Sequence, residues 1–338
     1  MTDPRATSTG PRTGVIVGSW PLGLPTSGTY YRDLAQQSES LGYDLLFSGD
    51  HLFMYSPNVE ALTVLAAFAA ATETIGIGTA VLLPALREPA LAAKQLASID
   101  YLSGGRLTVG VGVGGEIEQE WRAMEVPIPE RGRRTDEYLE LMAALWSGGQ
   151  VDFDGEFRSV HGVSGSPHPV RPDGIPIWVG GRSDAALRRA ARHEGWCAYA
   201  CSPRRIRESV ARLDELMGDR PPGYRISMVL FTVVNDDGDR ARSTATEVLN
   251  ARYRQDWDRF LDTMCAVGDP HHVASRVAEF RAAGVDDVIL CPQVPAEALP
   301  DQLTRLAEIC PGRASARAMK GSGWEGDLDE IRASQTRW

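Results

Sequence analysis

Short apolar runs alternate with amphipathic stretches along most of the chain. Several of these runs are almost continuously apolar, which is typical of parallel strands that are covered on both faces. The pattern predicts eight strands, at Gly14–Gly18, Tyr43–Phe47, Ile75–Val81, Leu107–Gly112, Ile175–Val179, Trp196–Cys201, Ile226–Val234 and Asp287–Cys291.

Hydrophobic positions at helical spacing fill the intervals between the predicted strands. In the stretch 135–146, for example, Tyr138, Leu141, Met142 and Leu145 fall on one face of a helix. The same spacing predicts eight helices, at Tyr30–Leu41, Glu60–Thr72, Pro89–Leu102, Thr135–Trp146, Asp184–His193, Arg204–Met217, His272–Ala283 and Ala298–Ile309.

Eight strands in alternation with eight helices predict an α/β protein with a (β/α)8 barrel, the TIM-barrel fold. Two segments are too long for a minimal repeat. Ser147–Gly174, rich in Gly and Pro, precedes the fifth strand, and Asn235–Pro270, which holds an extra helical pattern, follows the seventh. We expect one domain over residues 1–338, with its core at about 14–310 and a polar C-terminal tail at 312–338.

The composition excludes several classes of function. The net charge of −10 argues against nucleic acid or an anionic membrane as a partner, because both need a dominant basic face. The longest apolar run, at 64–71, is far too short to span a bilayer. The N-terminal segment has no apolar secretory region, and the five cysteines form no CxxC pair. We therefore expect a cytoplasmic protein with reduced thiols.

Common cofactor and catalytic motifs are missing or misplaced. The segment 110–115 matches the G-x-G-x-x-G pattern of dinucleotide-binding domains, but it lies at the fourth strand and lacks the following strand with an acidic end. There is no P-loop and no G-x-S-x-G nucleophile elbow, and the six histidines form no H-E-x-x-H pattern. The sequence thus predicts neither a Rossmann domain nor a metal site.

Barrel enzymes place their catalytic groups at the carboxyl ends of the strands. Asp50 and His51 follow the second predicted strand, and a histidine there can donate a hydrogen bond or move a proton near neutral pH. Glu116 follows the fourth strand and is a second candidate proton donor or acceptor. The alternative for each is a loop residue that only caps or packs.

Glycine-rich turns follow the fourth and fifth strands. The turn 112–115 permits close approach of a flat molecule to the barrel mouth. Gly180 and Gly181, ahead of Ser183 and a helix, form a candidate anion site, because backbone N–H groups can point outward from such a turn. An ordinary turn with Ser183 as the helix N-cap is the alternative.

Apolar and basic clusters add less specific signals. Four residues near the first and second strand ends can furnish an apolar pocket or part of the core: Trp20, Phe53, Met54 and Tyr55. Six arginines near helix starts are interpreted as solvated charges, with contact to an anionic ligand as the alternative: Arg131, Arg133, Arg134, Arg204, Arg205 and Arg207.

Several segments, in this order along the chain, resemble the luciferase-like flavin and deazaflavin oxidoreductases. They are Leu46–His51, Leu83–Pro89, Asp100–Leu107, Gly110–Gly115, Glu130–Gly132 with Asp136 and Glu137, Pro176–Gly181 and Val267–Pro270. The resemblance covers roughly residues 14 to 310. Jointly the segments are specific for the superfamily, whereas most are weak signals individually.

The resemblance implies a (β/α)8 barrel that binds FMN or the deazaflavin coenzyme F420 at its C-terminal mouth. Asp50 and His51 resemble the pair that the deazaflavin-using branch places beside the ring system, where it assists hydride or proton transfer. The family often has a non-proline cis peptide bond behind the ring, and the matching bond here is Ala80–Val81.

The resemblance also implies a role in cofactor binding for each of the two glycine-rich turns. Gly180 and Gly181 match the cofactor phosphate site, and Val113, Gly114 and Glu116 match the segment that meets cofactor and substrate. Deazaflavin-dependent sugar-phosphate dehydrogenases carry a tryptophan shortly after the Asp-His pair, where this chain has 53–55 Phe-Met-Tyr, so their substrate is not implied.

The first functional hypothesis is a coenzyme F420-dependent oxidoreductase that transfers a hydride to or from a small, fairly apolar substrate. The second is a two-component monooxygenase that uses reduced FMN and oxygen. A third, from another class, is a non-catalytic barrel that binds a flavin or deazaflavin. We expect a small-molecule substrate and a homodimer in each case.

Overall fold

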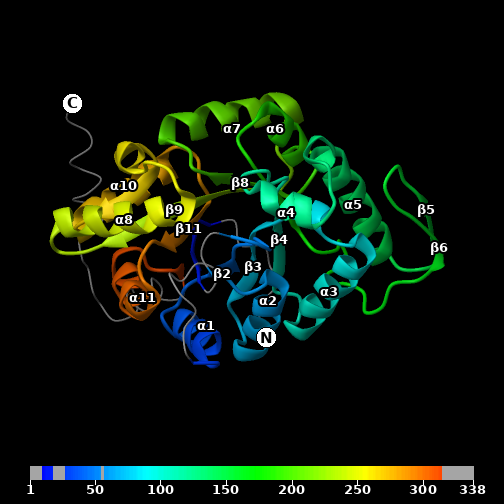
Figure 1. Cartoon of the computed structure of the whole chain (residues 1–338), viewed down its shortest axis with the longest axis horizontal. Helices are drawn as coiled ribbons and strands as arrows, with labels where there is room; N and C mark the ends of the chain where they lie inside the picture. The colour runs from blue at the N-terminus through cyan, green and yellow to red at the C-terminus, as the bar shows by residue number, and fades with distance from the viewer. Residues whose placement is uncertain (1–9, 18–26, 55–56, 314–338) are drawn as a thin grey trace.

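Eight parallel strands close into a barrel in the computed structural model, which describes residues 10–17, 27–54 and 57–313 (Figure 1). The strands pair in the order β1-β2-β3-β4-β7-β8-β9-β11, and β11 pairs with β1 to complete the circle. This confirms the predicted fold class. The barrel strands are β1 (Arg12–Ile16), β2 (Leu45–Ser48), β3 (Gly76–Leu82), β4 (Leu107–Val111), β7 (Ile177–Gly180), β8 (Gly195–Tyr199), β9 (Arg225–Val234) and β11 (Asp287–Pro292).

Helices surround the barrel and bury their apolar faces against it (Figure 1). Every predicted helix is present, with ends that shift by a few residues. The helices are α1 (Tyr30–Ser40), α2 (Ala61–Ala71), α3 (Pro89–Leu102), α4 (Glu118–Ala123), α5 (Arg131–Trp146), α6 (Asp184–Ala190), α7 (Pro203–Met217), α8 (Gly238–Tyr253), α9 (Leu261–Met264), α10 (Pro270–Ala282) and α11 (Leu299–Ile309). Short 3-10 turns lie at Pro84–Leu86, Ile128–Glu130, Asp258–Phe260 and Ala296–Ala298.

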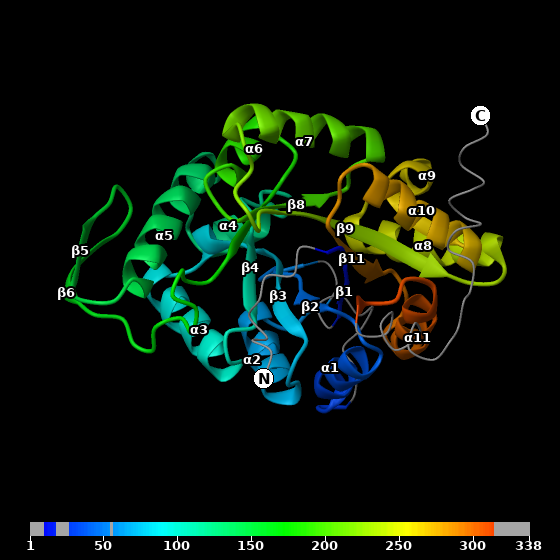
Figure 2. The ribbon, with the colours of Figure 1, turned by 180° about the vertical axis from the view of Figure 1, so that it is seen from behind.

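Both long segments expected between barrel units have a structure of their own. The first contains the antiparallel hairpin of β5 (Val151–Asp154) and β6 (Ser159–Val163), which projects beyond the ring of helices (Figure 2). The second contains α8, α9 and an additional strand, β10 (Cys265–Gly268). β9 pairs with β8 up to Val229 and with β10 from Phe231 onward. The second segment therefore extends the sheet at the carboxyl end of β9.

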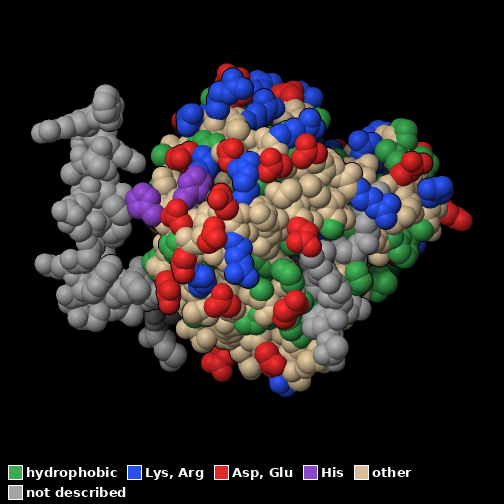
Figure 3. Space-filling view, turned by 60° about the vertical axis from the view of Figure 1, so that its left-hand side comes forward, with side chains coloured by type: hydrophobic (Ala, Val, Ile, Leu, Met, Phe, Trp, Pro, Cys, Tyr) green, Lys and Arg blue, Asp and Glu red, His purple; other side chains and the backbone are tan. Residues whose placement is uncertain are grey.

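The barrel strands are buried on both faces, as their apolar runs predict. All ten residues of β9 are buried, and one continuous hydrophobic core joins the strands to the helices. Acidic and basic side chains are interspersed over the face seen in Figure 3. Within the described ranges, each helix is too short or too polar to cross a lipid bilayer.

Candidate active site

The carboxyl ends of the barrel strands surround a cavity of about 300 Å³, which we call the inner chamber. All of the site residues predicted from the sequence line it: Asp50, His51, Ala80, Val81, Val113, Gly114, Glu116, Gly180 and Gly181. Their roles stay predictions, because a shared cavity shows position and not chemistry.

A bulge in β3 forms one wall of the inner chamber. The Ala80–Val81 peptide bond is cis, which confirms the expectation from the family resemblance. The register between β3 and β4 shifts between Thr79 and Leu82, so the bulged residues leave the ladder and face the chamber.

Glycines opposite the bulge make room for the Val81 side chain. A Cβ atom at Gly112 would lie 2.6 Å from Cγ2 of Val81, and one at Gly180 would lie 3.0 Å from Cγ1. Gly181 has a φ of +118°, and a Cβ there would lie 2.8 Å from that of Ala186. Larger residues at these positions would displace the wall of the chamber.

The His51 side chain is held by a buried carboxylate that the sequence analysis did not single out. Its Nδ1 lies 3.0 and 3.2 Å from the two carboxylate oxygens of Glu120, a residue only 1% exposed. The Phe53 backbone N–H also donates to Glu120, at 3.0 Å. An ionised carboxylate can only accept, so this contact assigns the donor role to Nδ1 and leaves Nε2 as the nitrogen that can exchange a proton.

Asp50 has a different environment from its neighbour. Its carboxylate receives two hydrogen bonds from the Arg87 guanidinium, at 2.6 and 2.8 Å, and one from the Leu83 backbone N–H at 2.9 Å. Arg87 in turn binds Glu60 at 2.7 Å. The hydrogen bonds to Asp50 therefore join the loops after β2 and β3, and His51 is the better placed of the two residues to move a proton.

We expect Glu120→Gln to lower turnover by about 10- to 100-fold, the scale found for carboxylates that orient metal-bound histidines. The amide can donate to Nδ1 and so stabilise the wrong tautomer of His51. The pH profile of turnover should change together with the rate, and Glu120→Asp should recover part of it. An unchanged profile in Glu120→Gln would show that Glu120 has only a structural role. Glu118→Gln, on the exposed first turn of the same helix, is the control.

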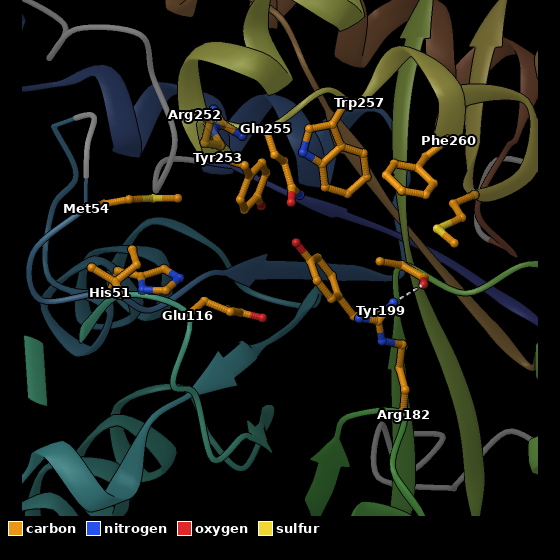
Figure 4. A pocket seen from close by; sticks show the side chains of 13 residues that line it. His51, Met54, Glu116, Arg182, Tyr199, Arg252, Tyr253, Gln255, Trp257 and Phe260 are labelled. Carbon is orange, nitrogen blue, oxygen red and sulfur yellow. Dashed lines mark hydrogen bonds between the residues drawn. The ribbon is translucent and has the colours of Figure 1, made fainter. Parts of the chain in front are cut away.

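A second cavity of about 380 Å³, the outer chamber, adjoins the inner one, and Figure 4 shows the side chains that line it. Five residues line both chambers: His51, Glu116, Arg182, Tyr199 and Tyr253. The segment after β9 supplies much of the remaining wall, through Arg252, Gln255, Trp257, Phe260 and Met264. Sequence reasoning missed these residues because their helical pattern carried no sign of where the segment lies relative to the barrel mouth.

Of the four apolar residues predicted near the barrel mouth, the structure describes Phe53 and Met54, which differ in exposure. Met54 lines the outer chamber, whereas Phe53 is 48% exposed. Trp20 and Tyr55 lie outside the described residues.

Four of the six highlighted arginines pair with nearby carboxylates, as expected for surface charges. These pairs are Arg133–Glu156, Arg134–Glu130, Arg204–Glu208 and Arg205–Glu208. Arg134 and Glu130 are half-buried, whereas the other three pairs are exposed and contribute little to stability.

The family model for luciferase-like monooxygenases matches residues 16–287, which is most of the barrel. The chain belongs to the luciferase-like monooxygenase family.

Relatives of this luciferase-like protein use two kinds of redox cofactor, according to their names. The FMNH2-dependent dimethylsulfone monooxygenase of Pseudomonas putida is 30% identical over 229 residues, 65% of this chain and 62% of that protein. The F420-dependent glucose-6-phosphate dehydrogenase of Microbacterium testaceum is 34% identical over 168 residues, 47% of this chain and 49% of that protein. An uncharacterised protein of Mycobacterium tuberculosis is 35% identical over 233 residues, 63% and 79% of the two chains.

Solved structures share the fold of this luciferase-like chain. The monooxygenase RslO1 from Streptomyces bottropensis superposes with a TM-score of 0.78 at 23% identity, covering 88% of this chain and 98% of its own. An F420-dependent secondary alcohol dehydrogenase superposes with a TM-score of 0.76 at 19% identity, covering 89% and 98%. Together with the family match, these findings identify the chain as a luciferase-like oxidoreductase.

Proposed function

We propose that this protein is a coenzyme F420-dependent oxidoreductase, which transfers a hydride between the deazaflavin and a small, fairly apolar organic molecule. The observation that supports it best is His51, oriented by Glu120 and facing the inner chamber beside Asp50. The Asp-His pair after β2 resembles the deazaflavin-using branch of the family, and the F420-dependent relative from Microbacterium testaceum is 34% identical over the matched region.

The inner chamber fits a flat ring system. Gly112, Gly114 and Gly180 line the chamber beside the apolar side chains of Val81 and Leu83 and contribute no side chains of their own. The titratable residues His51, Glu116 and Tyr199 line the same chamber. A flat molecule stacked on the bulge would have an apolar side, formed by Ala80 and Val81, and a side open to the outer chamber.

A bound deazaflavin supplies or accepts the hydride. The residues of the chain orient two flat molecules, exclude water and move the accompanying proton. Nε2 of His51 takes up or releases that proton, while Glu120 stabilises the protonated ring through Nδ1. Gly180 and Gly181 lie at the edge of the chamber, where the cofactor phosphate would bind.

A two-component FMN-dependent monooxygenase is the second candidate. The FMNH2-dependent relative from Pseudomonas putida matches 229 residues, a longer stretch than the 168 of the F420-dependent one. The same inner chamber would then hold reduced FMN, and the outer chamber the molecule to be oxygenated.

Anaerobic and aerobic turnover separate the two candidates. We expect the protein to oxidise reduced F420 without oxygen when it is mixed with a panel of small carbonyl compounds, or to reduce F420 with the corresponding alcohols. Formation of an oxygenated product only with reduced FMN and dioxygen would overturn the proposal in favour of the monooxygenase. A reaction without the protein and one with heat-denatured protein serve as controls for free-solution chemistry.

A further inference from the structure

The large apolar side chains that reach solvent gather on and beside helix α3. Among the described residues, six such side chains are exposed: Phe53, Leu91, Tyr101, Leu102, Met124 and Val163. Three of them belong to α3, and Phe53 and Met124 line a groove of about 470 Å³ together with Leu91. Exposed apolar patches of this kind mark sites of protein association. The outer side of α3 is therefore a candidate docking surface.

Four residues form one stripe along this side of α3. Leu91, Gln95, Ser98 and Leu102 follow the 3.6-residue period of a helix and so point the same way. Leu91 and Leu102, at the two ends of the stripe, are 57% and 62% exposed. Leu91 and Gln95 line the groove, whereas Leu102 lies about 16 Å farther along the helix axis than Leu91. The stripe therefore has a recess at its start and an apolar projection at its end.

This side of the molecule carries little charge, although the chain has a net charge of −10. Helix α2 lies beside α3 in Figures 1 and 2 and contains no charged residue, and its exposed positions are Thr63, Ala67 and Ala70. The only charged residue exposed on α3 is Lys94, because Asp100 is buried. An apolar surface helix of this kind is typical of burial against another protein.

The carboxylates that line the groove are paired within the chain. Glu60 binds Arg87 at 2.7 Å, and Glu88 binds Arg158 at 3.0 Å. Two copies of so acidic a chain repel each other wherever their carboxylates meet. On the side of α2 and α3 they can approach without that repulsion, which favours a second copy of the chain as the occupant.

The surface is also complementary to itself in shape. A two-fold axis that crosses α3 between Gln95 and Ser98 sets the helix antiparallel to its copy. Leu102 of each chain then lies over Leu91 of the other, so that the projection at one end of the stripe enters the recess at the other end.

The groove reaches the loop after β2 that carries His51. His51 and Phe53 both line it. The Phe53 N–H donates to the Glu120 carboxylate at 3.0 Å, the same group that orients His51, and the Phe53 carbonyl accepts from the Gln119 side chain at 3.0 Å. A side chain seated in the groove would cover Phe53 and restrict this loop.

We propose that a second copy of the chain docks on this side through a two-fold axis across α3, with Leu102 of each copy in the groove of the other, and that this contact holds the loop that carries His51. The expected homodimer thereby has a defined interface and a role at the active site. The inference does not depend on which cofactor the protein uses.

Sedimentation equilibrium of the protein without cofactor tests the docking. We expect twice the mass of one chain at micromolar concentration. Leu102→Glu should raise the dissociation constant of the dimer by about 100-fold or more, because the two-fold axis places an unpaired carboxylate in an apolar groove twice. Ala251→Glu is the matched control, since it adds the same charge at an exposed position of α8, across the barrel from α3 (Figure 1).

Two outcomes of this measurement would overturn the proposal. One is a monomeric parent, which would assign the surface to a different partner. The other is a dimer that Leu102→Glu leaves as stable as that of the parent, which would place the interface elsewhere. Circular dichroism confirms that each variant is folded.

An exchange of charges tests the antiparallel register. Leu91→Lys alone should weaken the dimer. The double variant Leu91→Lys/Leu102→Glu should regain at least about tenfold of the affinity lost in Leu102→Glu, because each lysine then faces a glutamate of the other copy. Within one chain the two positions lie about 16 Å apart along the helix, too far to pair. Absence of any gain in the double variant would contradict the register.

Hydrogen exchange of the Phe53 amide tests the link to the active site. It should be about tenfold faster in the Leu102→Glu monomer than in the parent dimer and should slow again in the double variant. The Ile177 amide, which donates to the Glu194 carboxylate at 2.9 Å at the start of β7, is the matched control and should not change. Equal exchange of Phe53 in dimer and monomer would overturn the proposed hold on the loop. These measurements use no cofactor, so their failure is distinct from failure of the proposed function.

Discussion

Replacing His51 with alanine should slow F420-linked turnover by about 10²-fold or more, the usual contribution of a positioned acid–base group. His51 lies at the end of β2, lines both chambers and is oriented through Nδ1 by the buried Glu120. Alanine removes the basic nitrogen while leaving the backbone contact between His51 and Asn58 intact. The fold should therefore survive the substitution.

Steady-state kinetics at saturating substrate are the direct measurement for His51→Ala, with circular dichroism to confirm that the variant is folded. His161→Ala is the matched control, because His161 is an exposed histidine of the β5–β6 hairpin, away from the barrel mouth. A turnover rate equal to that of the parent would contradict the role assigned to His51.

Asp287→Asn should lower the free energy of unfolding by about 3–5 kcal/mol, the usual cost of breaking a buried ion pair from one side. Asp287 is fully buried at the start of β11 and binds two guanidinium groups. Arg12 donates to it at 2.6 and 2.8 Å, and Arg225 donates from the other side. The substitution would leave the buried Arg225 and the half-buried Arg12 without their shared carboxylate, at the end of the barrel opposite the active site.

The same cluster makes stability depend on pH. Burial raises the pKa of Asp287, but the hydrogen bonds and charges of Arg12 and Arg225 outweigh it and hold the pKa below its ordinary value. The ionised form is therefore favoured in the folded protein, so the cluster stabilises the protein above the unfolded pKa of the carboxyl group. This contribution is lost as the pH falls through the folded pKa.

Urea unfolding at neutral and acidic pH measures both effects. Asp287→Asn should have a lower midpoint than the parent at neutral pH, and the difference should shrink in acid. Asp33→Asn, in an exposed pair with Arg32, is the control and should leave the midpoint unchanged. Equal midpoints for Asp287→Asn and the parent at neutral pH would show that the cluster contributes no stability.

The barrel could be predicted from sequence because its strands are buried on both faces and therefore appear as continuous apolar runs. Strand β10 could not be predicted from the sequence, since Cys265–Gly268 has only four residues and follows a helical pattern. The hairpin of β5 and β6 was also missed, because its exposed positions show no regular apolar alternation.

The inner chamber was predictable for a similar reason. Its residues follow strand ends, and a barrel brings strand ends together wherever they lie in the chain. Glu120 was missed because it meets His51 only through the fold, 69 residues away in sequence. Tyr253 was missed because it belongs to a helix in an insertion, and the helical pattern carries no information on its docking over the barrel mouth.

The central claim, a deazaflavin site at the barrel mouth, is tested most directly by equilibrium titration of the cofactor-free protein with F420 and with FMN. Fluorescence of each cofactor reports binding without any need for a substrate. The account predicts that F420 binds at least about tenfold more tightly than FMN, a difference of about 1.4 kcal/mol. Tighter binding of FMN, or no binding of F420, would contradict it.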